Sequence, residues 1–340
     1  MIKFTGDICF TDNHFDIGYG VGSKIAQGLV PFQYIHKESD DIWIGNLECV
    51  TSLISKHQDY RKTCFRIDPM LLQQQRLIDY FAVSNNHVME HGAMAYENMC
   101  TNVSTFSKGC FGSLGNKSIV FTSKGRTIAI SAFSLRKDQS NEDSLYWAFP
   151  ELSAIEQEYA SLKADVKVAY IHWGVEYINR PSVEQVRLAH WLIDLGYDLI
   201  VGMHPHILQG YEIYKGKYIF YSLGNFLFNM SYEPSLYSAV VVMDEISGEV
   251  SYKYIKIDEN CQPRIIEDEG VPSKYRFEYL NAFVGEILNS EEYVSLARRG
   301  LKAYRKSHHF TILKNIYKYD VKILSNIVLD FIKRRLGYVD

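Results

Sequence analysis

The chain has 340 residues, 47% hydrophobic and 22% charged, so it can bury one large core or two smaller ones, and no part of it reads as disordered. Its formal net charge of −4 gives no reason to expect nucleic-acid binding. The first residues lack the long uncharged run and cleavage site of a secretory signal, and no stretch approaches the roughly 18 apolar residues of a membrane span. Six cysteines without a CxxC pair are typical of reduced, structural thiols. These features predict a cytoplasmic globular protein.

The first 245 residues alternate short β-rich runs with helical patterns, which indicates stacked βα units and a largely parallel sheet. We expect strands at 2–9, 41–46, 80–84, 166–172 and 198–201. Helices are expected at 22–36, 69–79, 92–107, 150–163 and 182–195. Two short turns, at 124–125 and 215–217, each separate β-rich runs and predict antiparallel hairpins beside the parallel strands. The predicted fold is an α/β sandwich with mixed sheets over residues 1–257, followed by a helical extension over residues 258–340.

The C-terminal tail differs from the body in charge and pattern. Residues 296–340 contain eleven Lys or Arg against three Asp, a balance of +8. Apolar residues recur at spacings of three, four and seven, which predicts an amphipathic helix with lysines on its other face. We expect this helix to pack on its own domain or on a dimer partner, and the alternative is peripheral contact with the inner membrane. The apolar residues are Phe310, Leu313, Ile316, Tyr317, Val321, Leu324, Ile327, Val328 and Phe331.

Several polar clusters follow directly after predicted strands. Open α/β sheets place ligand sites at the carboxyl ends of their strands, so clusters that are separate in sequence can converge in space. The string GMHPH at 202–206 is the most specific of them. Because a proline disfavours the helical region for the preceding residue, we expect His204 to be extended, with the side chains of His204 and His206 on one side. A pair of surface histidines in a proline turn is the alternative.

Further candidate ligands end the neighbouring strands. His172 adds a third imidazole, unless it is a core histidine bonded to a carbonyl. Asn86 can ligate a metal through its amide oxygen, and His87 beside it can remain free to donate a proton, whereas a helix cap is the alternative for Asn85 or Asn86. Asp7 and Glu48 supply the carboxylates that balance the charge of divalent ions.

The order of these clusters resembles the calcineurin-like metallophosphoesterases, and the detailed strings resemble the CapA/PgsA proteins of capsule and poly-γ-glutamate synthesis. The matching strings are GDICF, GNLE, the Phe-Arg at 65–66, SNNHVMEHG, IHWGVEY, LIDLGYDLIVGMHPHILQG and YSLGNFLF, which together cover about residues 1–245. The resemblance implies the four-layer α/β sandwich of the calcineurin-like fold, with C-terminal helices added.

The resemblance also implies two divalent ions, of Mn, Zn or Fe, and a role for each cluster. Glu48 would bridge the ions. Asp7 and His206 would bind one ion, while Asn86, His172 and His204 would bind the other. His87 would be the catalytic partner, and Arg66 a candidate clamp for an anion because its planar fork suits carboxylate or phosphate.

The chain departs from the family pattern at a few positions. Cys9 stands where these enzymes usually carry a histidine ligand, so either Cys9 as a thiolate or the nearby His14 is a candidate replacement, and a buried inert thiol is the alternative for Cys9. Glu90 and Asn229 each stand where an aspartate is usual. Further candidate site residues lie within the matching strings: Asn46, Asn85, Glu176 and Asn225.

Two functions are compatible with these residues. The first is a metal-dependent hydrolase that cleaves a phosphoester or an amide such as a γ-glutamyl bond during synthesis of a cell-surface polymer, with an anionic small molecule or polymer as substrate. The second is a non-catalytic assembly or carrier protein that binds an anionic polymer or recruits a membrane synthase.

Overall fold

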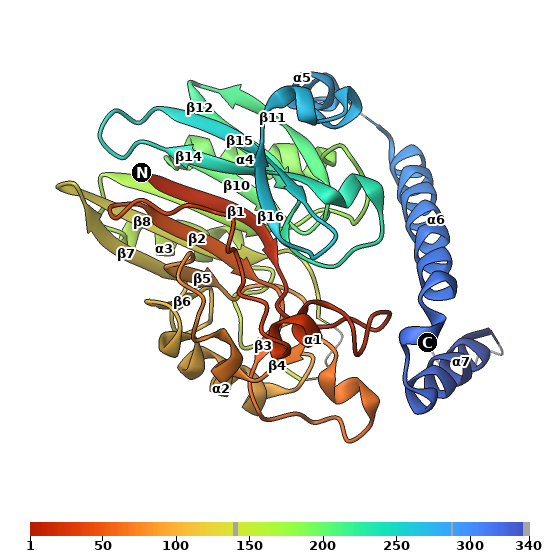
Figure 1. The fold of residues 1–340 in the computed structure, drawn as a ribbon. Coiled ribbons are helices and arrows are strands. Elements are labelled where there is room, and N and C mark those ends of the chain that lie inside the picture. Colours follow the sequence, from red (N-terminus) through yellow and green to blue (C-terminus); the bar gives the residue numbers. More distant parts are fainter. Residues whose placement is uncertain (139–141, 287, 336–340) are drawn as a thin grey trace.

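The computed structural model describes residues 1–138, 142–286 and 288–335, and its largest elements are two packed β-sheets (Figure 1). In the first sheet the strands that lie before residue 112 are parallel, and those between residues 237 and 266 continue the sheet in antiparallel pairs. This sheet has eight strands, in the order β16 (Pro263–Ile266), β15 (Val250–Ile257), β14 (Tyr237–Met243), β1 (Ile2–Ile8), β2 (Ile42–Leu47), β5 (Tyr80–Ala82) and β6 (Gly109–Phe111), with β13 (Asn225–Leu227) paired to β1.

The second sheet has a parallel centre with an antiparallel strand at each edge. Both edge strands belong to the hairpins that the sequence predicted. The six strands lie in the order β11 (Leu208–Tyr214), β12 (Lys217–Leu223), β10 (Leu199–Met203), β9 (Val166–His172), β8 (Arg126–Ser134) and β7 (Ser118–Ser123). A separate small pair is formed by β3 (Val50–Thr51) and β4 (Arg66–Ile67).

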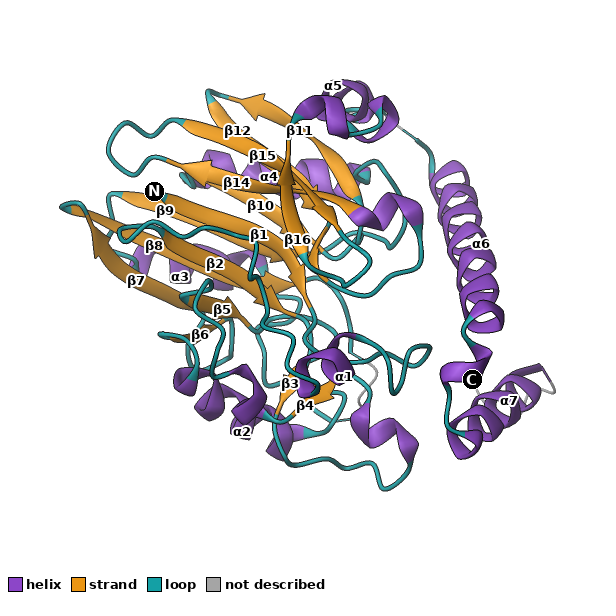
Figure 2. Cartoon of the chain, in the orientation of Figure 1, coloured by secondary structure: helices purple, strands orange, loops and turns teal. Residues whose placement is uncertain are grey.

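The two sheets pack face to face, and helices cover their outer faces (Figure 2). Phe4 and Ile44 of the first sheet share one buried cluster with Val168 and Val201 of the second. Beyond the second sheet, α3 (Leu152–Ser161) and α4 (Val183–Leu195) bury residues such as Leu192 against it. Beyond the first sheet lie α1 (Val21–Ala26) and α2 (Ala93–Asn102). The predicted four-layer α/β sandwich with mixed sheets is therefore confirmed.

Two of the predicted helices are shorter than expected. The segment predicted at 22–36 is helical only in α1, because Gly28 adopts a φ of 101° and Pro31 follows. The segment predicted at 69–79 forms only a 3₁₀ turn at Pro69–Leu72. After that turn the Gln75 side chain accepts a hydrogen bond from the Ile78 backbone N–H, which replaces a helical bond.

The C-terminal region contains α5 (Phe277–Leu280), α6 (Ser290–Lys314) and α7 (Val321–Arg335), and α6 runs along one side of the sandwich (Figure 1). The prediction of a single amphipathic helix from Phe310 to Phe331 is wrong. The α6 helix ends before Asn315, and α7 begins after Asp320, whose side chain accepts a hydrogen bond from the Lys322 backbone N–H. The side chains of Ile327 and Phe331 lie outside the described part. The first sheet also continues past residue 257, because β16 belongs to it.

No helix in the described ranges is both long enough and apolar enough to cross a membrane.

Candidate metal centre

The candidate site lies where parallel strands of both sheets end. In the first sheet Asp7 of β1 pairs with Asn46 of β2, and Glu48 follows two residues later. In the second sheet His172 of β9 pairs with Met203 of β10, directly before His204. Because the two sheets face each other, the polar residues at their strand ends meet in one buried place, as the strand-end argument predicted.

Three groups of side chains at this place present ligand atoms within 4.8 Å of one another. Two of the groups share Glu48, and all of their members are buried. The third group adds Glu176, which is half-buried. The groups are Glu48 with His172 and His204, Asp7 with Glu48 and His206, and Glu176 with His204 and His206.

Glu48 is the most unusual residue of the centre. Its side chain is fully buried, and neither carboxylate oxygen has a hydrogen-bond partner. The nearest imidazole nitrogens, His172 Nε2 at 3.6 Å and His206 Nε2 at 3.7 Å, are too far for hydrogen bonds. Two ligand atoms that share an ion with bonds of about 2.1 Å lie about 3 to 3.5 Å apart, so this spacing is close to that of a metal site. A buried carboxylate without a partner is costly, and a cation supplies the missing interaction.

His204 and His206 occupy a strained turn. Their φ values of 96° and 59° lie in the left-handed region, so the prediction that His204 is extended is wrong. The turn is held in part by Asp7, whose Oδ2 accepts a hydrogen bond from the His204 backbone N–H at 3.1 Å. Both ring nitrogens of buried His204 lack a partner. The conformation therefore aims an unsatisfied imidazole at the carboxylates.

Burial and mutual charge shift the pKa values of these groups strongly. Burial, followed by the negative charge of Asp7, raises the pKa of Glu48 well above its usual range. Burial opposes ionisation of Asp7 as well, but the hydrogen bond and charge of His206 lower its pKa. Burial lowers the pKa of His172 to about 3, whereas Glu48 and Asp7 overcome burial and raise that of His206 to about 10. Burial of so many ionisable groups at one place is costly, and bound cations would offset the cost of ionising the carboxylates.

Four asparagines orient the ligands. Asn46 donates to Asp7 Oδ1 at 2.8 Å and lies 3.2 Å from His172 Nδ1, so it links the two groups. Asn85 donates to Asn46 Oδ1 at 3.1 Å. Asn225 Oδ1 lies 2.9 Å from His206 Nδ1, which leaves Nε2 of that ring to face Glu48. Asn86 Oδ1 lies 2.8 Å from His172 Nε2, at the edge of the group that contains His204.

His87 stands beside the ligands and is partly accessible. Its Nε2 lies 3.9 Å from Glu48 Oε1, and its Nδ1 lies 3.5 Å from Glu90 Oε1. Its ring stacks on Phe65 at 4.1 Å between centroids. Although burial raises the pKa of Glu90, the nearby imidazole of His87 lowers it, so Glu90 serves as the carboxylate partner of this imidazole. Glu90 therefore reaches His87 although an aspartate is usual at this position.

Like His87 and the asparagines, three further predicted candidates lie outside the ligand groups of the described residues. Cys9 contacts the Thr11 hydroxyl at 3.2 Å, and burial followed by the nearby Cys49 holds the pKa of its thiol well above the usual value. His14 packs against Phe65. Arg66 donates to the carbonyl oxygens of Lys62 and Ser52, at 2.6 and 2.8 Å. Cys9 and His14 thus do not complete the set that contains Asp7, and two of the Arg66 donors are already used.

Sequence reasoning missed Arg136. Ser134 pairs with His172, the Leu135 N–H donates to the His172 carbonyl at 2.8 Å, and Arg136 follows directly. Burial is the main cause of the low pKa values of His172 and His204, and the positive charge of Arg136 is among the further causes. The strand-end rule could have found this residue, but the segment was interpreted only as half of an antiparallel hairpin.

Tyr177 was missed as well. Its ring stacks over His206 with 6.2 Å between centroids, and it also stacks on Tyr304 of α6 at 4.1 Å. The Tyr177 N–H donates to the Pro205 carbonyl at 2.9 Å, inside the histidine turn. Tyr177 therefore connects the centre to the C-terminal helix.

A family model described as "Bacterial capsule synthesis protein PGA_cap" matches residues 1–230. The chain belongs to this family. It is 34% identical over 169 residues to the PGA biosynthesis protein CapA of Bacillus subtilis, a match that covers 46% of this chain and 44% of that protein. It is 50% identical over 78 residues to the capsule biosynthesis protein CapA of Bacillus anthracis, covering 23% of this chain and 19% of the relative. The chain thus matches less than half the length of either relative.

Solved structures with related folds share little sequence with this protein. A phosphatase from Mycoplasma pneumoniae aligns with a TM-score of 0.47 and 12% identity, over 75% of this chain and 92% of that one. A 5′-nucleotidase from Candida albicans aligns with a TM-score of 0.46 and 12% identity, over 91% of this chain and 57% of that one. Because these scores are below 0.5, the fold assignment rests on the layers and strand order of the protein itself.

Proposed function

We propose that this member of the capsule synthesis family is a metal-dependent hydrolase that cleaves a phosphoester or an amide such as a γ-glutamyl bond in cell-surface polymer synthesis. The observation that carries the proposal is Glu48, a fully buried carboxylate with two unpartnered oxygens that two ligand groups share. Such a residue is suited to bridge two divalent ions, with Asp7 and His206 on one side and His172 and His204 on the other.

The donors fit Mn, Zn or Fe, since imidazole nitrogens and carboxylate oxygens bind all three. Two such ions, when bound, would lower the pKa of a water and neutralise the anionic oxygen of the substrate. The amide oxygen of Asn86 lies beside His172 and would complete the second ligand group. The asparagines behind the centre would hold the imidazole rings in their binding orientations.

His87 would supply the proton for the leaving group. Its Nδ1 faces Glu90, so its Nε2 faces the centre and can carry the transferable proton. Stacking on Phe65 restrains the ring in that orientation. Arg136 follows two residues after Ser134, which pairs with His172, and it is a better candidate than Arg66 to hold an anionic group of the substrate, because two donors of Arg66 already bind backbone carbonyls.

A non-catalytic assembly or carrier role has one specific observation in its favour. With the Cys9 thiol protonated and outside the ligand groups, the ion near Asp7 would have only three protein ligands from these groups. A centre of that kind could hold an anionic polymer without turning it over.

The direct test is hydrolysis by the purified chain of a chromogenic phosphodiester and of poly-γ-glutamate. We expect cleavage of at least one substrate, loss of activity in EDTA and recovery with Mn, Zn or Fe. Glu48→Gln should abolish activity, while Glu97→Gln, which changes an exposed carboxylate on α2, should leave it intact. Inertness toward both substrates with every metal would favour the carrier role.

A further inference from the structure

The two faces of α6 have different surroundings. Its inner face packs on the body: Tyr304 stacks on Tyr177, the Ser307 hydroxyl donates to the Ser231 carbonyl, and His308 is buried against Phe15. The opposite face is exposed to solvent along most of the helix. It therefore presents its side chains outward.

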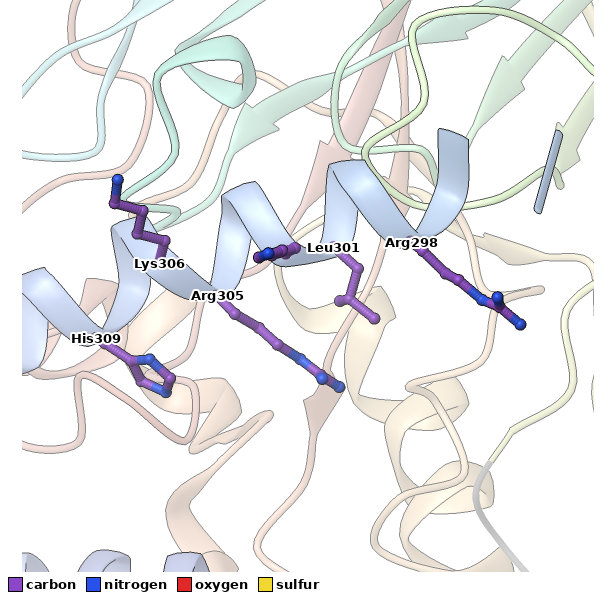
Figure 3. Close-up of a pocket in the computed structure, with 6 residues that line it drawn as sticks. Arg298, Leu301, Arg305, Lys306 and His309 are labelled. Carbon is purple, nitrogen blue, oxygen red and sulfur yellow. The ribbon is translucent and has the colours of Figure 1, made fainter. Parts of the chain in front are cut away.

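The exposed face of α6 is strongly cationic. Its side chains line a shallow hollow of about 550 Å³, and Arg298, Arg305 and His309 extend from the same side of the helix (Figure 3). From Arg298 to Lys322 the sequence contains eight Lys or Arg and a single acidic residue, Asp320. The residues that line the hollow are Arg298, Leu301, Lys302, Arg305, Lys306 and His309.

Further exposed apolar side chains follow along the chain, from the end of α6 to the start of α7. Phe310 and Leu313 are 69% and 68% exposed, and Tyr317 and Val321 are 78% and 82% exposed. Leu313 lies seven residues after Lys306, two helical turns along the same side of α6. Large apolar groups this open to water, next to cations, form an amphipathic surface that no described part of the chain covers. We call the hollow and these four residues the basic apolar face.

The segment that carries the basic apolar face is fixed to the body by contacts of its inner side. Between the two helices Tyr319 is buried, its hydroxyl donates to the Phe15 carbonyl, and it contacts the Tyr19 hydroxyl at 2.8 Å. On α7, Ile323 packs against the core. The exposed side chains are thus displayed by a fixed segment.

We propose that the basic apolar face docks the protein on an anionic lipid surface. Lysine and arginine side chains attract acidic headgroups, and α6 offers several cations along the hollow. Phe310, Leu313 and Tyr317 would enter the boundary between headgroups and acyl chains, which removes their apolar surface from water. Charge and apolar exposure therefore favour the same partner.

The main rival occupants satisfy only one of these two features. A second copy of the chain could cover the apolar residues, but a symmetric contact would place one cationic helix against another. A soluble polyanion could pair with the cations but would leave Leu313 and Val321 in water. A lipid surface accommodates both.

Docking in this way would place the metal centre close to the membrane. The inner face of α6 contacts Tyr177, which stacks over His206. The inference does not depend on hydrolysis, because lipid binding can be measured in the absence of substrate.

Flotation with vesicles tests the proposal. We expect the full chain to bind vesicles of mixed phosphatidylcholine and phosphatidylglycerol, not vesicles of phosphatidylcholine alone, and to release as salt is raised. Lys302→Glu with Lys306→Glu should weaken binding at least about tenfold. Phe310→Glu with Leu313→Glu should weaken it to a similar extent.

The matched control is Lys253→Glu with Lys256→Glu, which makes the same charge change at exposed positions of β15. This variant should bind like the unchanged chain, and thermal melting should show that all variants fold. Equal binding by the control and the α6 variants would overturn the proposal. So would absence of binding to the acidic vesicles, or light scattering that shows a dimer lost in Phe310→Glu with Leu313→Glu.

Discussion

At the scale of single residues, the centre depends on close backbone contacts behind its ligands. Asp7 is placed by its N–H, which donates to the Gly224 carbonyl at 2.9 Å. Gly6, just before it, has no room for a side chain, because an added Cβ would lie 1.8 Å from the Gly224 oxygen. A glycine at position 6 is therefore needed to bring the Asp7 carboxylate to the centre.

We predict that Gly6→Ala lowers the free energy of unfolding by about 3 kcal/mol or more, because the backbone must move to admit the methyl group. Thermal or urea unfolding measures the change. The matched control is Gly115→Ala, where an added Cβ meets nothing within 4 Å and stability should change by less than about 0.5 kcal/mol. Equal stability of the two variants would show that Gly6 and Gly224 do not approach this closely.

The proposed proton donor gives a second prediction at this scale. His87→Ala should lower turnover by about 10² to 10⁴-fold, because the leaving group loses its proton source. Metal content should stay unchanged, since His87 belongs to none of the ligand groups. Metal analysis beside the kinetic assay checks both parts, and a variant that retains full turnover would remove His87 from the mechanism.

At the scale of elements, the most informative contact is that of α6 with the body. His308 is only 4% exposed and sits on the inner face of the helix. Burial, followed by the charge of His309, lowers the pKa of His308 to about 4. The docked helix thus holds this imidazole neutral.

The sign of the pH effect follows from that shift. An undocked His308 has a pKa near its ordinary 6.5, so between about pH 6.5 and 4 the undocked state binds the extra proton. The docked state is therefore most stable, with respect to this histidine, above pH 6.5. It loses stability as the pH falls from 6.5 to 4. The protection factors of the amides of residues 290–314, taken against the intrinsic exchange rate at each pH, should therefore fall on acidification. His308→Phe should remove the part of the response below pH 6.5, and an unchanged response would contradict the assignment.

The elements also show where sequence patterns were insufficient. The predicted strands at 2–9, 166–172 and 198–201 match β1, β9 and β10 to within two residues, because buried apolar runs mark them clearly. The helices predicted at 22–36 and 69–79 were mostly wrong, since Gly28 and Pro31 end the first and the Gln75 side-chain bond replaces a helical bond in the second. The end of α6 before Asn315 was missed because apolar residues recur at helical spacing on both sides of it.

At the scale of the whole molecule, the strand-end rule explains why the centre could be anticipated. Glu48 and His204 are far apart in sequence, yet both follow parallel strands whose ends meet between the sheets. Arg136 was missed because its strand was interpreted only as half of a hairpin, and Tyr177 was missed because its role depends on how α6 packs, which no local pattern records. The positive φ values of His204 and His206 are likewise set by the tertiary fold.

The central claim is that Glu48 joins two divalent ions in one buried centre. The most direct measurement is the metal content per chain by elemental analysis, after incubation with Mn or Zn and removal of unbound ions. We predict about two ions per chain for the unchanged protein and for Glu97→Gln, and fewer than one for Glu48→Gln. Absence of bound metal in the unchanged protein, or equal content in Glu48→Gln, would contradict the account.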